Sequence, residues 1–326
     1  MKTKIVFLTT AFIALSFLSC SSAGKNETAE PAAIKPRSTS VKFNADTAMR
    51  YLARQVEFGP RVPDTPAHKE CADWLTNQLR AMGARVTSET ERISHPVDGK
   101  PINVRNIFAS FNPDASKRIL VLAHYDTRPW ADEDADPSNR NKPIDGANDG
   151  ASGVAVALEL ARLNSHLKSD QGLDILFVDQ EDSGNSGTDE SWCIGSAHWS
   201  RNLPYTPQQM PEFAILLDMV GGRDAVFMRE YFSEAAAPSI NAKIWETAQK
   251  LNYGNRFPDV IGGAVNDDHI WLLKAGIPAV DIIEMNTDPS SKGFNSTWHT
   301  LDDNLGNIDK TTLQMVGDVI TSVIYD

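Results

Sequence analysis

The sequence predicts an α/β fold in which helices cover both faces of a central mixed, largely parallel twisted sheet, giving a three-layer sandwich. Two observations lead to this prediction. Short apolar runs rich in Val, Ile and Phe alternate along the chain with helical apolar patterns. The runs are apolar at consecutive positions, as in strands that are buried on both faces. No linker interrupts residues 41–326, so we expect one domain there.

Two helices are predicted at the start of this domain. Asn44 can cap the first, whose apolar residues recur at helical spacing, and Thr65-Pro66 can open the second, which ends at Gly83. Apolar runs then predict strands at 104–111, 119–123, 173–178, 213–217 and 279–283. Helical patterns lie between and after them at 154–163, 240–251, 270–274 and from 309 onward.

The residues before 41 lie outside the predicted domain. Lys2 and Lys4 precede an uncharged stretch, 5–18, which has the length of a signal-peptide core and is short for a membrane span. The residues around Cys20 (LSFLSCSS) resemble a bacterial lipoprotein signal, in which cleavage leaves this cysteine as the lipid-modified first residue. An ordinary cleaved secretion signal is the alternative.

This pattern divides the chain into three parts. We expect a signal peptide over 1–19, a lipid-attached flexible tether over 20–40 and a single α/β domain over 41–326. The tether is small, polar and Pro-containing, without apolar periodicity. A lipoprotein signal implies the bacterial cell envelope, so we expect a periplasmic protein that meets a membrane only through its lipid anchor.

Composition excludes some classes of partner. The 31 Lys and Arg residues face 43 Asp and Glu residues, and the net charge of −12 opposes binding to nucleic acid. The three cysteines, Cys20, Cys71 and Cys193, are too few for a disulfide scaffold and wrongly spaced for a thiolate zinc site. We therefore expect any metal to be held by carboxylates and imidazoles. We expect Cys71 and Cys193 to be unpaired buried thiols, and a single disulfide between them is the alternative in an oxidising compartment.

Polar side chains follow three of the predicted strands. His124 comes after one run, residues 179–182 (DQED) follow another, and Asp218 follows a third. Because the carboxyl ends of parallel strands meet at one edge of a sheet, we expect these groups to converge there. Each alone could be a helix cap or a solvated turn residue. Together they indicate a metal site.

Four sequence blocks carry a resemblance to a known family: 124–127 (HYDT), 146–153 (GANDGASG), 179–182 (DQED) and 298–304 (WHTLDDN). In order and context they resemble the zinc aminopeptidases of the M28 family. Three further stretches, 61–63 (RVP), 217–221 (LDMVG) and 267–269 (DDH), are similar to the glutaminyl cyclases within that superfamily. The resemblance runs from about Asn44 to the C-terminus and implies a zinc aminopeptidase-like form of the α/β fold.

The resemblance also implies a set of site residues. The zinc ligands are Asp149, Asp182 and His299; the general acid/base is Glu181; the acids beside it are Asp218 and Asp267; and the pocket walls are Trp298 and Trp192. Three protein ligands leave one tetrahedral position of a single zinc ion open, as a catalytic zinc requires.

Some positions depart from the animal cyclases. Asp182 stands where those enzymes carry a glutamate ligand, and Asp281 stands where they carry a histidine. A shorter carboxylate still reaches zinc if the backbone lies closer, so the ligand set is retained. Gly187 stands at the place of a pocket tryptophan, and Trp192 is the substitute that we expect.

The resemblance implies a zinc-dependent cyclotransferase that converts N-terminal glutamine of peptides or proteins to pyroglutamate and releases ammonia. An alternative on the same residues is a di-zinc aminopeptidase, in which His124 and Asp218 bind a second metal, Asp149 bridges and Glu181 activates a water. A third interpretation, a lipid-anchored binding protein without activity, would lack a ligand or Glu181, and neither is missing. We favour a monomer.

Several other polar residues are interpreted as structural. An acidic run lacks the glycine and the terminal glutamate of a calcium loop, so we expect a solvated insertion at Asp132, Glu133, Asp134 and Asp136. Four histidines have no partner acids at ligand spacing and are expected at the surface or in helix caps: His68, His95, His166 and His198.

Overall fold

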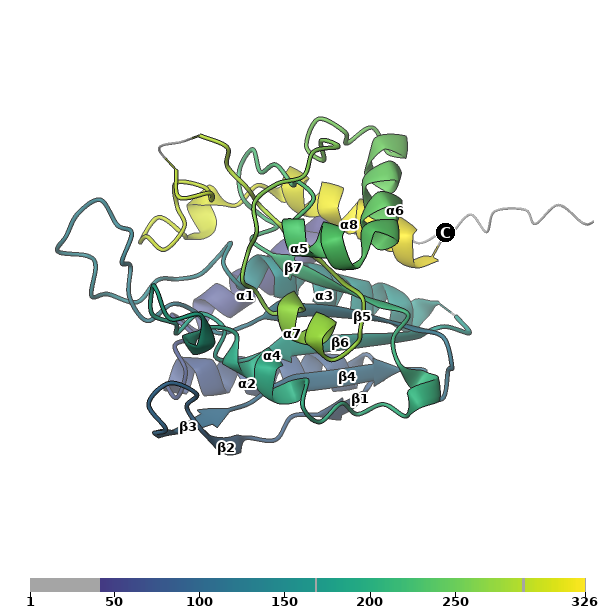
Figure 1. Ribbon diagram of the computed structural model, residues 1–326, viewed down its shortest axis with the longest axis horizontal. Coiled ribbons are helices and arrows are strands. Elements are labelled where there is room, and N and C mark those ends of the chain that lie inside the picture. The colour runs from purple at the N-terminus through teal and green to yellow at the C-terminus, as the bar shows by residue number, and fades with distance from the viewer. Residues whose placement is uncertain (1–41, 168, 289–290, 326) are drawn as a thin grey trace, which may run out of the picture. The chain divides into compact units, whose positions relative to one another are not determined.

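Figure 1 shows the computed structural model, which describes residues 42–167, 169–288 and 291–325. These residues belong to one compact unit. The predicted signal peptide and tether lie outside the described residues. No helix within the described ranges is both long enough and apolar enough to cross a membrane.

Six strands form the central sheet. In spatial order they are β1 (Arg85–Thr87), β4 (Ile107–Phe111), β6 (Gly172–Val178), β5 (Arg118–His124), β7 (Phe213–Asp218) and β8 (Ala279–Ile283). The neighbours among β6, β5, β7 and β8 pair parallel, whereas β4 is antiparallel to both β6 and β1. The sheet is therefore mixed and largely parallel, which confirms the predicted fold class.

The parallel strands are buried along their whole length, as the consecutive apolar residues predict. β5 lies between two parallel neighbours, with Ile119 opposite Leu173 of β6 and Phe213 of β7. Alternate β5 side chains enter different cores: Val121 belongs to the larger apolar cluster and Leu122 to the one on the other face. The carboxyl ends of β5, β6, β7 and β8 consequently share one edge of the sheet.

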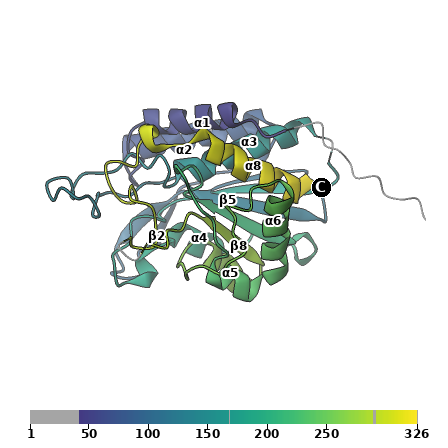
Figure 2. The same ribbon diagram turned by 90° about the horizontal axis from the view of Figure 1, so that it is seen from above.

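Helices cover both faces (Figure 2). One layer contains α1 (Ala45–Glu57), α2 (Pro66–Ala81), α3 (Ala151–His166) and α8 (Lys310–Tyr325), with α3 packed on the central strands. The opposite layer contains α4 (Ile194–Trp199) and α7 (His269–Lys274), while α5 (Tyr231–Ala236) and α6 (Pro238–Lys250) pack against β8. A separate two-stranded sheet joins β2 (Glu91–Ser94) to β3 (Pro101–Val104).

The predicted caps of the two leading helices are confirmed. The Asn44 side chain accepts a hydrogen bond from the N–H of Thr47 (3.0 Å), and Thr65 accepts one from the N–H of His68 (3.3 Å). Each bond satisfies a backbone donor that has no partner within the helix.

The strand predicted over 104–111 is wrong in its first half, because β4 begins only at Ile107. Side chains bind the backbone where the strand would continue. The Arg105 N–H donates to Asp179 Oδ2 (2.8 Å), and Asn106 Oδ1 accepts from the N–H of Asp179 (3.0 Å). These bonds replace the ladder between strands and tie this segment to the loop that follows β6.

Candidate active site

The carboxyl edge of the sheet brings together side chains from distant parts of the chain. His124 is the last residue of β5, and Asp218 is the last residue of β7. The loops beyond the strands add Glu181 and Asp182 after β6, Asp149 before α3, and His299 near the C-terminus. None of these six residues is more than 9% exposed. The predicted convergence at this edge is thus confirmed.

Asp149, Asp182 and His299 form a group that fits a zinc ion. One ligand atom of each lies within 4.8 Å of the others. His299 Nε2 is 3.3 Å from Asp182 Oδ1 and 3.8 Å from Asp149 Oδ2. A tetrahedral zinc ion with bonds of about 2.1 Å holds neighbouring ligand atoms about 3.4 Å apart. Asp182 Oδ2 is also buried without a hydrogen-bond partner in the described part of the chain, and a cation would satisfy it.

Two buried carboxylates hold the backbone of the loops that carry Asp149 and Asp182. Asp303 accepts hydrogen bonds from the N–H of Asp149 (3.1 Å) and from that of the preceding residue (2.7 Å). Asp126 accepts from the N–H groups of Glu181 and Asp182, both at 3.2 Å. Both loops are therefore fixed by groups behind the site, as metal ligands require.

His299 has an outer partner that sequence reasoning missed. Asp132 Oδ1 lies 3.3 Å from His299 Nδ1, and the same carboxylate accepts two hydrogen bonds from Arg128 (2.6 and 2.9 Å). Asp134, 8% exposed, accepts a hydrogen bond from the N–H of Leu301 (3.1 Å). The expectation of a solvated insertion is wrong for these two acids. The Asp134 partner lies 167 residues further along, so no local pattern could reveal it.

Electrostatics around His299 favour a cation. Burial lowers the pKa of the His299 imidazole, but Asp182, Asp132 and Asp149 outweigh burial and raise that pKa to about 9. Burial raises the pKa of Asp182, and Asp149 raises it further. A divalent ion between these groups would relieve the repulsion between the two carboxylates and displace a proton from the imidazole.

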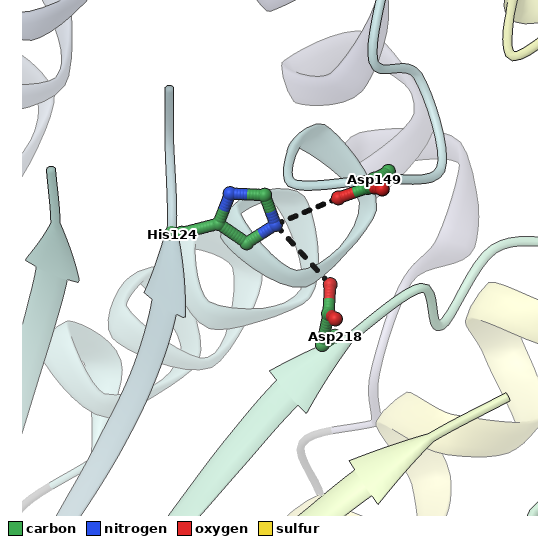
Figure 3. A group of neighbouring side chains, drawn as sticks. All are labelled: His124, Asp149 and Asp218. Carbon is green, nitrogen blue, oxygen red and sulfur yellow. Dashed lines mark hydrogen bonds and ion pairs between the residues drawn. The ribbon is translucent and has the colours of Figure 1, made fainter. Parts of the chain in front are cut away.

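His124, Asp149 and Asp218 form a second group of metal-ligand types (Figure 3). His124 Nε2 is 3.0 Å from Asp149 Oδ1 and 3.2 Å from Asp218 Oδ1. These are hydrogen-bond distances, and they also lie close to the separation of about 3.4 Å expected between ligand atoms around zinc. Burial lowers the pKa of His124, but the nearby carboxylates of Asp126, Asp149 and Asp218 outweigh burial and raise that pKa well above its ordinary value. A protonated His124 imidazole would therefore balance the charge of Asp149 and Asp218 when no second metal ion is bound.

Glu181 lies beside His124 and lines the pocket. Its Oε2 is 3.8 Å from His124 Nδ1, and its Oε1 accepts a hydrogen bond from the thiol of Cys193 (3.4 Å). Burial raises the pKa of Glu181 well above its ordinary value; His124 opposes this effect, and Asp182 and Asp267 add to it. A carboxyl group tuned toward neutrality can both accept and return a proton.

Asp218 and Asp267 line the pocket beside Glu181. Burial and the nearby Asp218 raise the pKa of Asp267 to about 7. Burial also raises the pKa of Asp218, against the hydrogen bond from His124. Neighbouring buried acids of this kind hold protons jointly, so one of them donates a hydrogen bond while the other accepts.

Asp281 is a buried acid behind the site. It lies in β8, is fully buried, and has no hydrogen-bond partner for either carboxyl oxygen among the described residues. Burial, reinforced by Asp267 and Glu230, raises the pKa of Asp281 well above its ordinary value. Its Oδ2 is 3.8 Å from Nδ1 of His269, whose Nε2 is 3.1 Å from Glu230 Oε2.

A pocket of about 260 Å³ opens onto these groups. Both tryptophans that the sequence indicates line it. The Trp298 ring lies 3.8 Å from the His299 ring at 25°, and the Trp192 ring lies 6.2 Å from it at 11°. A Cβ on Gly184 would lie 2.1 Å from the Trp192 ring, so only glycine leaves room for this arrangement. The pocket is thus walled by aromatic rings over a floor of acids.

The backbone near the site adopts left-handed conformations at residues other than glycine. The φ angles are +57° at Gln180, +55° at Cys193, +47° at Met219 and +54° at His299. Such conformations cost free energy and persist only where the surroundings enforce them. Here they turn the chain sharply beside Glu181, Asp218 and the pocket.

His68 and the two described cysteines lie outside this group of site residues. His68 is only 6% exposed and its Nε2 lies 2.8 Å from Asp179 Oδ1, so the expectation that it lacks a partner acid is wrong. Cys71 and Cys193 are both buried and free, which confirms the expected unpaired thiols.

The chain is similar to known proteins in sequence and in fold. Residues 106–324 match the model of peptidase family M28. The crystal structures of glutaminyl cyclases from Bacteroides thetaiotaomicron (bound to N-acetylhistamine) and Porphyromonas gingivalis are each 46% identical, with a TM-score of 0.83; the alignments cover 88% and 86% of this chain and 99% and 97% of those chains. Glutaminyl-peptide cyclotransferase of Boiga irregularis is 26% identical over 303 residues, covering 82% of this chain and 77% of that protein. The chain therefore belongs to peptidase family M28 and, within it, to the glutaminyl cyclases.

Proposed function

We propose that this chain is a zinc-dependent glutaminyl-peptide cyclotransferase, which converts the N-terminal glutamine of peptides or proteins to pyroglutamate and releases ammonia. One observation carries the proposal beyond family membership. Asp149, Asp182 and His299 are spaced for a zinc ion with one open position, in the same pocket as Glu181 and the two tryptophans. One zinc ion suits activation of the substrate's own carboxamide.

The proposed site holds one zinc ion, bound by Asp149, Asp182 and His299. When bound, this ion supplies Lewis-acid polarisation of the carboxamide oxygen of the substrate. Metal analysis of the purified variants tests this count. His299→Ala is expected to contain no zinc, and His124→Ala is expected to retain it. Two zinc ions in the parent chain and one in the His124 variant would contradict this count.

Glu181 carries the proton in the proposed reaction. The substrate's α-amine attacks the side-chain carboxamide carbon, a new C–N bond closes the five-membered ring, and the bond from that carbon to the amide nitrogen breaks. Glu181 accepts a proton from the attacking amine and delivers it to the departing nitrogen, which leaves as ammonia. No water molecule is consumed, so atoms balance between glutamine, pyroglutamate and ammonia.

Asp218 and Asp267 orient the leaving nitrogen in this proposal. As a pair that shares a proton, they accept hydrogen bonds from the amide N–H₂ group and keep it facing Glu181. Trp298 and Trp192 pack against the aliphatic part of the glutamine side chain. The acids of the pocket floor favour a free α-amine, which selects peptide N-termini.

The function is tested by mass spectrometry of two peptides incubated with the purified zinc-loaded protein. A peptide with N-terminal glutamine is expected to lose one ammonia, and a matched peptide with N-terminal leucine is expected to stay intact. Release of the first residue from either peptide would instead support the di-zinc aminopeptidase. The His124–Asp149–Asp218 group offers that enzyme its second metal site.

We further propose that the protein is exported and held in the periplasm by a lipid on Cys20. This rests on the signal-like stretch before Cys20 and on the polar tether after it. In bacteria supplied with a labelled fatty acid, the parent chain should carry the label and sediment with membranes. The Cys20→Ser variant should do neither. An unlabelled parent chain in the soluble periplasmic fraction would indicate an ordinary secretion signal. A monomer is the oligomeric state that we expect in solution.

A further inference from the structure

A third group of metal-ligand residue types lies beside the proposed catalytic base. One ligand atom each of Glu181, Cys193 and Asp267 lies within 4.8 Å of the others. The thiol sulfur of Cys193 is 3.4 Å from Glu181 Oε1. A tetrahedral zinc ion with a Zn–S bond of about 2.3 Å and a Zn–O bond of about 2.1 Å separates these atoms by about 3.6 Å. The group is therefore spaced for a metal ion.

The surroundings of Glu181, Cys193 and Asp267 let an ion reach them from the pocket and carry an excess of acidic side chains. Glu181 and Asp267 line the pocket, so an ion can reach them from solvent, while Cys193 is fully buried behind them. Asp218 also lines the pocket and Asp268 follows Asp267 in sequence; both are buried. His124 and His269 are the basic groups whose charge acts on these acids. The acids outnumber these basic groups, so a divalent cation would lower the repulsion.

The group shares no residue with Asp149, Asp182 and His299, so an ion could bind here while the catalytic zinc stays in place. Its donors also differ in kind. A thiolate with two carboxylates favours borderline and soft divalent cations such as Zn²⁺ and Cd²⁺ over Mg²⁺ or Ca²⁺.

We propose that Glu181, Cys193 and Asp267 form an inhibitory metal site for a second Zn²⁺ or Cd²⁺ ion. Binding releases the thiol proton and places the ion on the carboxylate that the proposed function uses as its base. Glu181 then cannot accept a proton from the substrate. The inhibitory effect rests on the proposed function, whereas the binding itself does not.

The experiment titrates Cd²⁺ into the zinc-loaded full chain and follows the ultraviolet charge-transfer absorption of a thiolate–Cd²⁺ bond. Cd²⁺ that exchanges into the carboxylate and imidazole site gives no such absorption, because that site has no sulfur. The band is expected with one Cd²⁺ per chain in the parent and in the Cys20→Ser and Cys71→Ser controls. Cys71 is the matched control, since it is also free and fully buried. Cys193→Ser and Cys193→Ala are expected to lose the band.

Asp267→Asn keeps the thiol and removes one carboxylate, so the band should persist with about tenfold weaker affinity for Cd²⁺. This variant tests the site even if both Cys193 variants fail to fold. Absence of the band in the parent chain, or its persistence in a folded Cys193 variant, would overturn the site. Unchanged affinity in Asp267→Asn would remove that residue from it.

Activity gives the second readout. Added Cd²⁺ is expected to slow cyclisation of the glutamine peptide by the parent chain, and the concentration for half inhibition should rise about tenfold in Cys193→Ser relative to that variant's own basal rate. A chain that binds Cd²⁺ but shows no cyclase activity would refute the proposed function and leave the metal site standing. A chain that cyclises the glutamine peptide without showing the absorption band would support the proposed function and refute the metal site.

Discussion

At the scale of single residues, Glu181 differs from the ligands around it because its oxygens face a thiol and an imidazole at long distances. Cys193 Sγ is 3.4 Å from Oε1 and His124 Nδ1 is 3.8 Å from Oε2. Neither contact is a strong hydrogen bond, so the carboxyl is held in place without being fixed in its ionised form. This leaves Glu181 available for proton transfer.

The Glu181→Gln variant tests that role. Glutamine keeps the size of the side chain but cannot carry the proton, so cyclisation should fall by a factor of about 10² to 10⁴. Zinc content should remain that of the parent chain, because Glu181 is not among the three proposed ligands. Metal analysis beside initial rates separates the two quantities, and near-normal turnover would exclude Glu181 as the acid/base.

The convergence of the site residues could be predicted because each of them stands in a recognisable sequence block. The carboxylates that support them could not be predicted. Asp132 contacts a histidine that lies far along the chain, and the Asp126 and Asp303 carboxylates bind backbone N–H groups, which leave no mark on the sequence. Burial of His68 against Asp179 was missed for the same reason.

At the scale of elements, α3 packs unusually close to β7. A Cβ built on Gly153 of α3 would lie 1.9 Å from the carbonyl oxygen of Leu217. An alanine in a free helix would stabilise it by about 1 kcal/mol relative to glycine. Here the methyl group must push the helix off the strand that carries Asp218.

Gly153→Ala is therefore expected to destabilise the protein by about 1 to 3 kcal/mol, as overpacked sites do. Denaturant unfolding of the variant and the parent chain measures the difference. Gly263→Ala is the control, because nothing lies within 4 Å of its added Cβ. Equal or higher stability of Gly153→Ala would show that the helix and strand can separate at little cost.

The N-terminus of α5 depends on a buried charge. Glu230 accepts hydrogen bonds from the N–H groups of Phe232 (3.0 Å) and Ser233 (2.7 Å), and His269 Nε2 lies 3.1 Å away. Burial raises the pKa of Glu230, but His269 and these backbone donors outweigh burial and lower that pKa from 4.5 to about 2. The folded state thus favours the ionised form.

A lowered pKa stabilises the fold above the ordinary value of 4.5, and this contribution is lost as pH falls from about 4.5 to about 2. The parent chain should exceed Glu230→Gln in free energy of unfolding by about 3 kcal/mol near neutral pH. The gap should shrink steadily with acid. Exposed Glu246 on α6 gives the control variant, Glu246→Gln. If the difference in free energy of unfolding between the parent chain and Glu230→Gln does not change with pH, the variant is destabilised by altered packing and not by loss of the charge.

Sequence patterns predicted the long buried elements and two short ones, α7 and β8, but missed the other short strands and helices. The strands β5 to β8 and the helices α1 to α3 have enough apolar residues to show a period. β1, β2, α4 and α5 have three to six residues each, so neighbouring contacts decide their conformation. The break after β3 was missed because bonds to Asp179 set it.

At the scale of the whole molecule, the proposed zinc joins two loops from the middle of the domain to a third near its C-terminus. Asp149 precedes α3, Asp182 follows β6 and His299 lies close to α8 in sequence. Without the ion, the carboxylates of Asp149 and Asp182 repel each other. Zinc should therefore stabilise the fold as well as the reaction.

Removal of zinc with a strong chelator is expected to abolish cyclisation and lower the thermal unfolding temperature. Free zinc at a thousandfold excess over its dissociation constant contributes about 4 kcal/mol to stability. Calorimetry of the chelated, parent and zinc-restored samples measures the shift, and restored zinc should return both quantities. An unchanged unfolding temperature would mean that the metal does not bridge these loops.

The two carboxylates behind the site, Asp126 and Asp303, have one more consequence. Loop amides ordinarily exchange their hydrogens with solvent quickly, because small openings expose them. The N–H groups of Asp149, Glu181 and Asp182 are instead bonded to acids that are at most 1% exposed. In deuterated water these three amides should exchange as slowly as those of β5, so the loops that hold the proposed metal would open only when the core itself does.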